Sequence, residues 1–419
     1  MNIIKTNQKI NFVIALILFI IFLSSCEKDQ QEQVPNRLIL VYMIADNDLD
    51  YFAIRNINDM ERGFQTNTNG DLLVYIDRAE NAYPSHPYLM KISHDTTDLV
   101  VSEIIKTYPE QNSADANTLK TVLDDAIKTS SKTYTSKGIV LWSHGSAWLP
   151  SGTSLYSNRG NIVDSVKSSS TLKSFGIDTK FQANSVSIHE MDIKDMANVL
   201  NGYDLEFILF DACFMATIEV AYELRNTNKY FIASPVEILS SGFPYKTTVP
   251  LFFDEVINPD LIAKNYYDYY SNQHGVLKSG AISVIKSSEL DNLATSVNEL
   301  CNKIGVLSLD SHNNILNIDS LQQFDRLKVG VLFDLKQFLY IESSNLNDFL
   351  LLNKINNTLN NTIISEYHTR NVLGSLPLNN CNGLSTFLPH KTSINVYDYY
   401  KTLSWYKASG YNKAFFDNY

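Results

Sequence analysis

The sequence contains few cysteines, and their spacing predicts no metal site. Four cysteines occur among 419 residues, at positions 26, 213, 301 and 381. Neither a CxxC nor an HExxH motif is present, so a zinc site has no support from spacing. No spacing typical of a calcium-binding loop occurs either.

The sequence also lacks an excess of positive charge and any biased tract. Its net charge is −11. Residues 1–25 contain two lysines and no acid, so the rest of the chain carries a net charge of −13. Such a chain has no bulk attraction for nucleic acid or anionic lipid, although local basic patches stay open. No repeat, Gly/Pro-rich tract or clear linker divides it, which is typical of an ordinary globular protein of one large domain or two smaller ones. No pattern predicts an oligomeric state.

No apolar run reaches the ~20 residues that a spanning helix needs, but a shorter one lies at the N-terminus. Lys5 and Lys9 precede about a dozen apolar residues, and Leu-Ser-Ser-Cys closes the run at Cys26, which is typical of a signal peptide. This ending resembles the bacterial lipoprotein signal, which implies lipidation of Cys26, an exported protein and anchoring to a cell-envelope membrane. Residues 27–36 then form the rest of a polar tether that starts at residue 26. The alternatives are a plain secretory signal or an uncleaved anchor.

Lipidation would leave Cys213, Cys301 and Cys381. An odd number of thiols allows one disulfide and leaves a reactive thiol in an exported protein. The positions of Cys301 in an amphipathic helix and of Cys381 before a strand favour structural roles.

Buried strands alternate with helices through the first half of the chain. Continuous apolar runs predict strands at 38–45, 72–76, 138–143, 206–210 and 230–235, and helical spacing predicts helices at 46–63, 114–130, 188–200 and 214–225. Residues 87–104 indicate an edge hairpin, and 150–185 a long loop. This alternation predicts an α/β fold with a mostly parallel sheet.

The second half is less regular. Helices are predicted near 250–272, 287–304 and 330–365, strands at 281–285 and 383–389, and a Tyr-rich helix at the end. The Tyr-rich runs 266–270 and 397–411 could stack on sugars, but aromatic residues at helical spacing are more often packing residues.

Two reactive side chains follow buried strands. His144 stands after 138–143 and Cys213 after 206–210, and sites in open parallel sheets lie at the carboxyl ends of strands. A helix starting at Cys213 would stabilise its thiolate, and a nearby imidazole could protonate a leaving amine. The N–H groups of Gly145 and Cys213 could form an oxyanion hole. The alternative for Cys213 is a small core residue.

The segments WSHGSAWLP (142–150), FDACFM (210–215) and ASPVEILSSGFPY (233–245) resemble the clostripain-type cysteine peptidases. The segments 40–53 and 382–389 fit the same family, so the resemblance spans residues 37–419. It implies a caspase-like domain, a His144–Cys213 dyad and endopeptidase activity on protein or peptide substrates. Asp211 would line the S1 pocket and favour Arg or Lys at P1.

The resemblance also implies activation by self-cleavage in the loop 150–185, with Arg159, Lys167 and Lys173 as candidate cut sites. No cofactor is required, although calcium is used by some family members. The chain departs from the family at Ala147, where members commonly carry Gly. Alanine would be strained there if the backbone needs a positive φ.

Several residues have competing interpretations. His274 also precedes a glycine, but it follows a polar Tyr-rich helix and is expected to be a helix C-terminal cation. Asp211 could cap the following helix instead of lining a pocket. Glu237 is expected to be an exposed loop acid.

Two other functions use the same fold. The protein could be a weak or inactive surface lipoprotein that serves as a binding module, although a binder has no need of a His–Cys pair. It could also transfer an acyl group to an amine instead of to water.

Overall fold

The computed structural model describes residues 35–131, 133–149, 175–179, 189–304, 320–327, 330–388 and 394–414. The described residues from Asn36 onward form one compact unit. No helix in this described part has the length and apolar character needed to cross a membrane.

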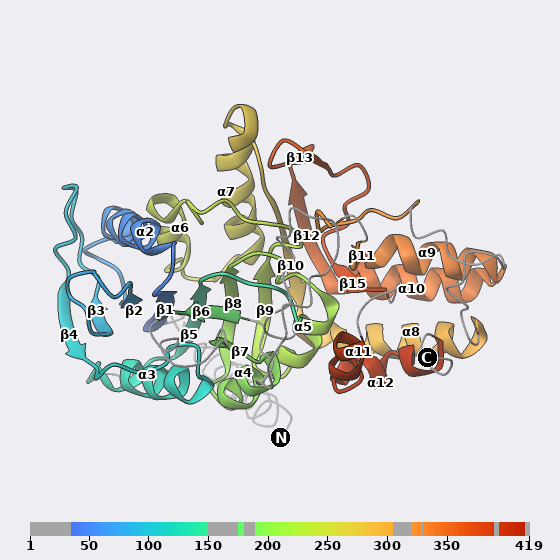
Figure 1. The fold of residues 1–419 in the computed structure, drawn as a ribbon, viewed down its shortest axis with the longest axis horizontal. Coiled ribbons are helices and arrows are strands. Elements are labelled where there is room, and N and C mark those ends of the chain that lie inside the picture. Colours follow the sequence, from blue (N-terminus) through green and yellow to red (C-terminus); the bar gives the residue numbers. More distant parts are fainter. Residues whose placement is uncertain are drawn as a thin grey trace, which may run out of the picture. The chain divides into compact units, whose positions relative to one another are not determined.

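The centre of the fold is a nine-stranded sheet in the order β12-β10-β9-β8-β5-β1-β2-β3-β4 (Figure 1). Its parallel block is β1 (Arg37–Ala45), β2 (Gly70–Arg78), β5 (Ser136–Trp142), β8 (Leu205–Asp211) and β9 (Asn228–Ala233). Each of the five predicted strands coincides with one of these, although the predictions 138–143 and 230–235 run one and two residues past the ends of β5 and β9. Apolar runs without alternation suit strands buried on both faces.

Antiparallel strands extend both edges of this block. The predicted hairpin is β3 (Tyr88–Lys91) with β4 (Glu103–Thr107). On the other edge lie β10 (Ala281–Lys286) and β12 (Ile363–His368). Strand β12 was not predicted, because it follows a helix directly with no Gly or Pro between them.

Helices cover both faces of the sheet (Figure 1). On one face lie α2 (Asp50–Gly63), α6 (Tyr245–Leu251) and α7 (Pro259–Ser271), which pack on one apolar cluster. On the other lie α3 (Ala116–Lys128), α4 (Ile193–Leu200), α5 (Ile218–Leu224) and α8 (Leu290–Ile304), which share a second cluster. The predicted α/β fold, a mostly parallel sheet between two layers of helices, is confirmed.

Two predictions around the long loop need correction. Within 150–185, Phe175–Asp178 form strand β6, which pairs with β7 (His189–Met191). The helix predicted from 188 therefore begins only at Ile193, where Asp192 caps it by accepting the Lys194 N–H.

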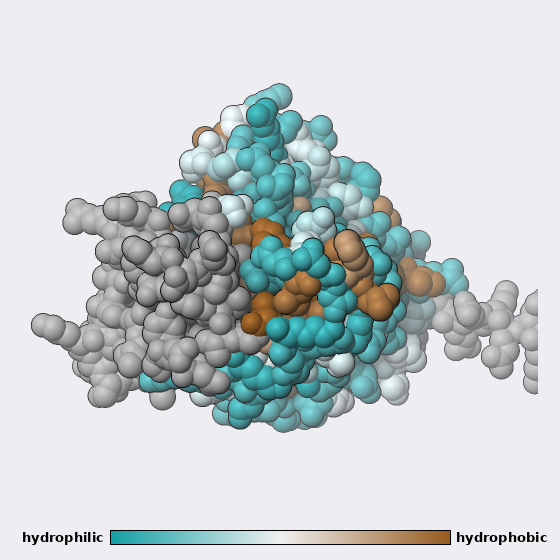
Figure 2. Space-filling view, turned by 90° about the vertical axis from the view of Figure 1, so that its right-hand side faces the viewer, coloured by the Kyte–Doolittle hydropathy of each residue, from teal (hydrophilic) through white to brown (hydrophobic). Residues whose placement is uncertain are grey.

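The C-terminal part adds α9 (Leu335–Asn345), α10 (Phe349–Thr362) and the short strands β11 (Leu332–Asp334), β13 (Asn371–Val372), β14 (Leu376–Pro377) and β15 (Ser385–Phe387). The single Tyr-rich helix is instead three: α11 (Ile394–Tyr400), α12 (Ser404–Ala408) and α13 (Tyr411–Ala414). Figure 2 views this side of the molecule, where hydrophobic residues gather among hydrophilic ones. At the start of α10, the apolar side chains of Phe349 and Leu350 are exposed.

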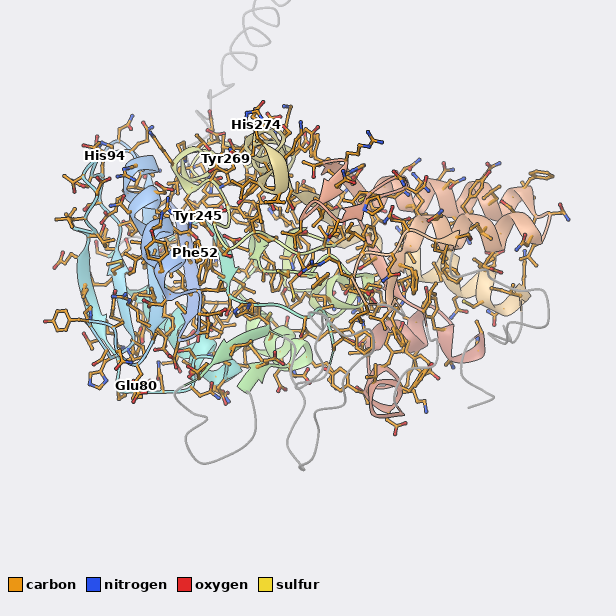
Figure 3. All side chains as sticks on the ribbon, turned by 45° about the horizontal axis from the view of Figure 1, so that its top comes forward. Phe52, Glu80, His94, Tyr245, Tyr269 and His274 are labelled. Atoms are coloured by element: carbon orange, nitrogen blue, oxygen red, sulfur yellow. The ribbon has the colours of Figure 1, made fainter. Side chains whose placement is uncertain are left out.

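The Tyr-rich segments are mainly packing elements. Tyr266 and Tyr270 of α7 are buried, whereas Tyr269 is 45% exposed (Figure 3). Tyr400 of α11 is buried against Trp148, with ring centroids 4.7 Å apart, and its hydroxyl donates to Glu219. These contacts support the packing interpretation of both runs.

Candidate active site

Strand register places His144 and Cys213 side by side at one edge of the sheet. In the parallel β5–β8 pair, Trp142 lies opposite Asp211, and both strands end there. His144 and Cys213 each lie two residues further on. Both line one pocket of about 240 Å³. The chain therefore brings a thiol and an imidazole together from segments 69 residues apart.

The helix after Cys213 starts later than predicted. Helix α5 begins at Ile218, and Thr217 caps it by accepting the Val220 N–H. Residues between Cys213 and Thr217 form a loop in which Phe214 has a φ of 62°. Cys213 is therefore not at a helix N-terminus. The prediction that a helix starting at Cys213 stabilises its thiolate is wrong.

This loop is fixed by the segment that follows β9. The Phe214 N–H donates to the Val236 carbonyl at 3.0 Å, and the Ala216 N–H to the Ser234 carbonyl at 2.9 Å. These two hydrogen bonds hold the backbone after Cys213 in a non-helical loop. The helical spacing of the sequence had predicted a helix there.

The Cys213 thiol contacts the backbone of Ile238. The Ile238 N–H donates to Sγ at 3.2 Å, and Sγ lies 3.7 Å from the Ile238 carbonyl. An N–H donor aimed at sulfur favours the thiolate. Cys213 is partly exposed, so a substrate can reach it.

The other two described cysteines differ sharply. Cys301 and Cys381 are buried, and burial raises the pKa of Cys301 to about 12 and that of Cys381 well above its usual value. All three described cysteines are free thiols, so the disulfide that their number allowed is not formed among them.

His144 is held by an acid that the sequence reading missed. Its Nε2 lies 2.7 Å from Oδ1 of Asp48, which follows β1 at the same edge of the sheet. Asp48 precedes α2 in a run of Asp and Asn, and that run signals only the start of a helix. His274, the competing histidine, lies beyond the end of α7 (Figure 3). It precedes a short 3-10 helix, to which its side chain makes no capping hydrogen bond.

Gly145 packs directly against the Cys213 loop. A Cβ added to Gly145 would lie 2.7 Å from the Cys213 carbonyl oxygen, so only glycine allows this approach. On the other side of the histidine loop, the Gly176 N–H donates to the His144 carbonyl at 3.0 Å. Strand β6 is thereby attached to the active site.

Ala147 has a φ of 60° and is fully buried. This is the left-handed region, where a Cβ is strained and glycine is not. The chain thus carries backbone strain at Ala147, as expected if the backbone there has a positive φ.

Asp211 lines the pocket, is buried, and does not cap α5, because Thr217 does. Its Oδ2 accepts from the Phe243 N–H at 3.0 Å and from the Tyr245 hydroxyl at 2.8 Å. Burial raises the pKa of Asp211 to about 6. Gly242, with a φ of +65°, is required beside it, because a Cβ there would lie 2.5 Å from Oδ2.

The prediction for Glu237 is also wrong. It is 6% exposed, not an exposed loop acid, and Arg326 binds both its carboxylate oxygens at 2.5 and 2.8 Å. The Arg326 guanidinium also interacts electrostatically with Cys213. This cation beside the thiol was missed because it lies far along the chain from the motifs.

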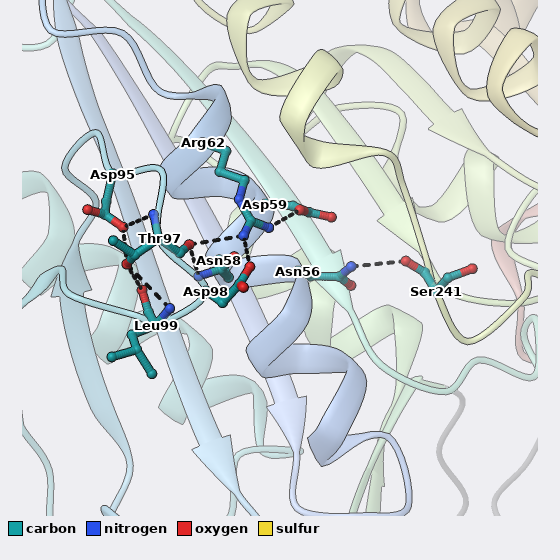
Figure 4. A network of polar contacts seen from close by, with 9 residues as sticks. All are labelled: Asn56, Asn58, Asp59, Arg62, Asp95, Thr97, Asp98, Leu99 and Ser241. Carbon is teal, nitrogen blue, oxygen red and sulfur yellow. Dashed lines mark hydrogen bonds and ion pairs between the residues drawn. The ribbon is translucent and has the colours of Figure 1, made fainter.

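Helix α2 makes polar contacts with neighbouring segments, including Ser241, which lies between the pocket residues Ser240 and Gly242 (Figure 4). The Asn56 amide donates to the Ser241 carbonyl and accepts from the Trp142 indole N–H, both at 2.9 Å. Arg62, further along α2, binds Asp59 and reaches the Thr97 carbonyl and Asp98. Leu49 and Leu373 complete the apolar lining.

Several predicted residues lie outside the described ranges. These are the lipidation site Cys26 and the candidate cut sites, namely Arg159, Lys167 and Lys173.

The fold and pocket define a cysteine peptidase of the caspase-like class. A sequence model of the clostripain family matches residues 41–417. The chain therefore belongs to the clostripain family of C11 peptidases, as the motifs around His144 and Cys213 predicted.

Solved structures agree with this assignment. A secreted C11 cysteine protease from Bacteroides thetaiotaomicron, in complex with an irreversible peptide inhibitor, is 30% identical with a TM-score of 0.71, and the match covers 90% of this chain and 99% of that one. An inactive zymogen C11 protease from Parabacteroides distasonis is 29% identical with a TM-score of 0.69, covering 90% and 98%. No curated protein matches.

Proposed function

We propose that this protein is a cysteine endopeptidase that cleaves after Arg or Lys. The observation that carries the proposal is one pocket lined by Cys213, His144 and the buried Asp211. A pocket lined by a partly exposed thiol and a buried carboxylate suits a long basic P1 side chain. The Asp211 hydrogen bonds described above both end on Oδ2, so Oδ1 would receive the P1 cation.

The proposed reaction has two steps. The Cys213 thiolate attacks the scissile carbonyl carbon, and the oxyanion is held by the N–H groups of Gly145 and Cys213. His144 gives a proton to the amine as the C–N bond breaks. Water then adds to the acyl-enzyme and passes a proton to His144, and the C–S bond breaks. Every step uses groups of this chain, so no cofactor is required.

The contact between His144 and Asp48 supports different roles for the two ring nitrogens in the proposed mechanism. An ionised Asp48 accepts a hydrogen bond from Nε2–H, so Nδ1 is the nitrogen that exchanges protons with the thiol and the leaving amine. Asp48 is thus a positioning residue in the proposed mechanism.

Self-cleavage within 150–185 fits the attachment of β6 to the His144 carbonyl. A cut after Arg159, Lys167 or Lys173 would leave Phe175–Asp178 in place beside the histidine while the preceding segment is released. The similarity to a C11 zymogen supports activation by cleavage.

The protein is also proposed to be an exported lipoprotein anchored through Cys26, since one relative is described as secreted and the signal ends in Leu-Ser-Ser-Cys. Mass spectrometry of the mature N-terminus should find a diacylglyceryl-modified Cys26. A mature chain that starts elsewhere would contradict this.

The test of peptidase activity uses residues 27–419. Wild type should react at Cys213 with a Lys- or Arg-based thiol-reactive probe and cleave peptides after basic residues, whereas Cys213→Ala should do neither. Cys301→Ala is the matched control, because that thiol is buried, and it should keep both properties.

Mass spectrometry of the purified chains gives the activation test. Cuts in 150–185 should be present in wild type and missing in Cys213→Ala. No labelling and no cleavage, even after limited proteolysis of 150–185, would refute the peptidase proposal.

A further inference from the structure

Strand β12 lies at the edge of the sheet, beside β10 (Figure 1). Two of its residues belong to a second cluster of reactive side chains. It consists of Glu366, His368 and Cys381, and one ligand atom from each lies within 4.8 Å of the other two. Glu366 and His368 are two residues apart on one face of the strand. Cys381 comes from the loop between β14 and β15.

The hydrogen bonding of His368 prepares one ring nitrogen for a metal. Its Nδ1 lies 3.0 Å from the Thr369 carbonyl, which can only accept, so Nδ1 carries the proton and Nε2 carries the lone pair. Nε2 lies 3.6 Å from Oε1 of Glu366. Tetrahedral zinc with ordinary bond lengths separates a nitrogen and an oxygen ligand by roughly 3.4 Å.

Two buried oxygens at this place have no hydrogen-bond partner among the described residues. They are Oε1 of Glu366 and Oγ of Ser283. Ser283 lies directly opposite Glu366 in the β10–β12 pair. Both side chains face Gly383, where an added Cβ would come within 2.4 Å of the Ser283 Oγ and 2.6 Å of Glu366. Buried oxygens without donors are rare and commonly mark a missing water or ion.

The local charge favours a cation. The carboxylates of Glu366 and Asp334 lie near the Cys381 thiol and make the potential there negative, and that thiol donates a hydrogen bond to Glu366. The same negative potential attracts a metal ion, which would displace the thiol proton.

We propose that Glu366, His368 and Cys381 bind a divalent transition metal of the zinc type, with water as the fourth ligand near the Ser283 hydroxyl. A carboxylate, an imidazole and a thiolate form a mixed donor set that suits zinc and not calcium. The ion would join β12 to the segment before β15 and close the intervening loop, whose Leu373 lines the catalytic pocket. The proposal does not depend on peptidase activity.

The test measures binding to residues 27–419 carrying Cys213→Ala, which removes the catalytic thiol as a competing ligand. Elemental analysis after dialysis against Zn²⁺ should find one equivalent, and Co²⁺ should give thiolate charge-transfer and tetrahedral ligand-field bands. His368→Gln and Cys381→Ser should lose at least 10-fold in zinc affinity. Zinc should raise the melting temperature of the parent protein and not that of the variants.

His94→Gln and Cys301→Ala are matched controls and should bind zinc like the parent. His368 is partly exposed, so His368→Gln keeps the test valid even if Cys381→Ser fails to fold. Absence of stoichiometric zinc, binding unchanged in His368→Gln, or displacement of zinc by equimolar Ca²⁺ would overturn the proposal. The cluster would then be an ion pair with a thiol hydrogen bond.

Discussion

Two regions of the molecule combine a cysteine, a histidine and buried acids. One is the carboxyl edge of the parallel strands, and the other is the corner around β12. They differ in how the chain brings these residues together. At the parallel edge, His144 and Cys213 follow two neighbouring strands that end in register. At the corner, two residues of one edge strand meet a cysteine from a loop. The first arrangement gives a partly exposed thiol and the second a buried one, so equal residue types do not imply equal chemistry.

The largest effect expected in testing this difference is that of Asp211→Asn compared with Asp334→Asn. Burial raises the pKa of each acid to about 6, but Asp211 lines the pocket whereas Asp334 caps α9. Asp211→Asn should lower kcat/KM for Arg or Lys at P1 about 100-fold or more, because a buried charge pair is lost. Asp334→Asn should lower stability and leave P1 preference unchanged. Equal P1 profiles for the two variants would contradict the role of Asp211.

The pH dependence of the wild type follows from the same pKa. Activity on basic substrates should rise as Asp211 ionises through a pKa of about 6, and Asp211→Asn should lack this limb. Stability moves the opposite way. The pKa of Asp211 is higher in the folded chain than in the unfolded chain. Its contribution to the free energy of unfolding is therefore fully present below about pH 4 and is lost as pH rises to about 6. Urea unfolding of both proteins between these values measures the difference.

The sequence predicts the parallel edge well because its signals are local. Apolar runs mark the strands, and a reactive residue after each run marks the site. Prediction from the sequence fails where contacts between residues far apart in the chain determine the local structure. Phe214 has helical spacing, yet hydrogen bonds from the Cys213 loop to residues 234–236 delay the helix to Ile218. Arg326 reaches Glu237 from 89 residues away, and no local pattern reports such a contact.

The corner was not predictable for the same reason. Helix α10 runs into β12 without a Gly or Pro, so the strand that carries Glu366 and His368 has no boundary signal. Cys381 then joins them through tertiary packing. A zinc site is recognised in a sequence when its ligands follow a short, regular spacing. Ligands that come from a strand and a separate loop leave no such pattern.

A smaller effect is expected at Asp48, which acts through His144. Asp48→Asn should lower kcat about 3- to 10-fold with KM unchanged, because the Asp48 side chain is 84% exposed and water screens its charge. The basic limb of the pH profile should also shift, which a purely structural role would not cause. Asp48→Glu should restore part of the rate. Asp98→Asn, an exposed acid that binds Arg62, is the control and should have no effect; an equal loss there would remove the role of Asp48.

The smallest effect is expected at Ala147, where backbone strain and side-chain burial oppose each other. Ala147→Gly would relieve about 1–2 kcal/mol of left-handed strain. It would also lose about 0.8 kcal/mol from a buried methyl group and about 0.5–1 kcal/mol from the greater freedom of the unfolded chain. The free energy of unfolding should therefore change by less than about 1 kcal/mol. Ala126→Gly, at a buried position in the regular helix α3, has no strain to relieve and should cost about 2 kcal/mol. Equal losses in the two variants, measured by urea unfolding, would show that the left-handed backbone at Ala147 stores no strain.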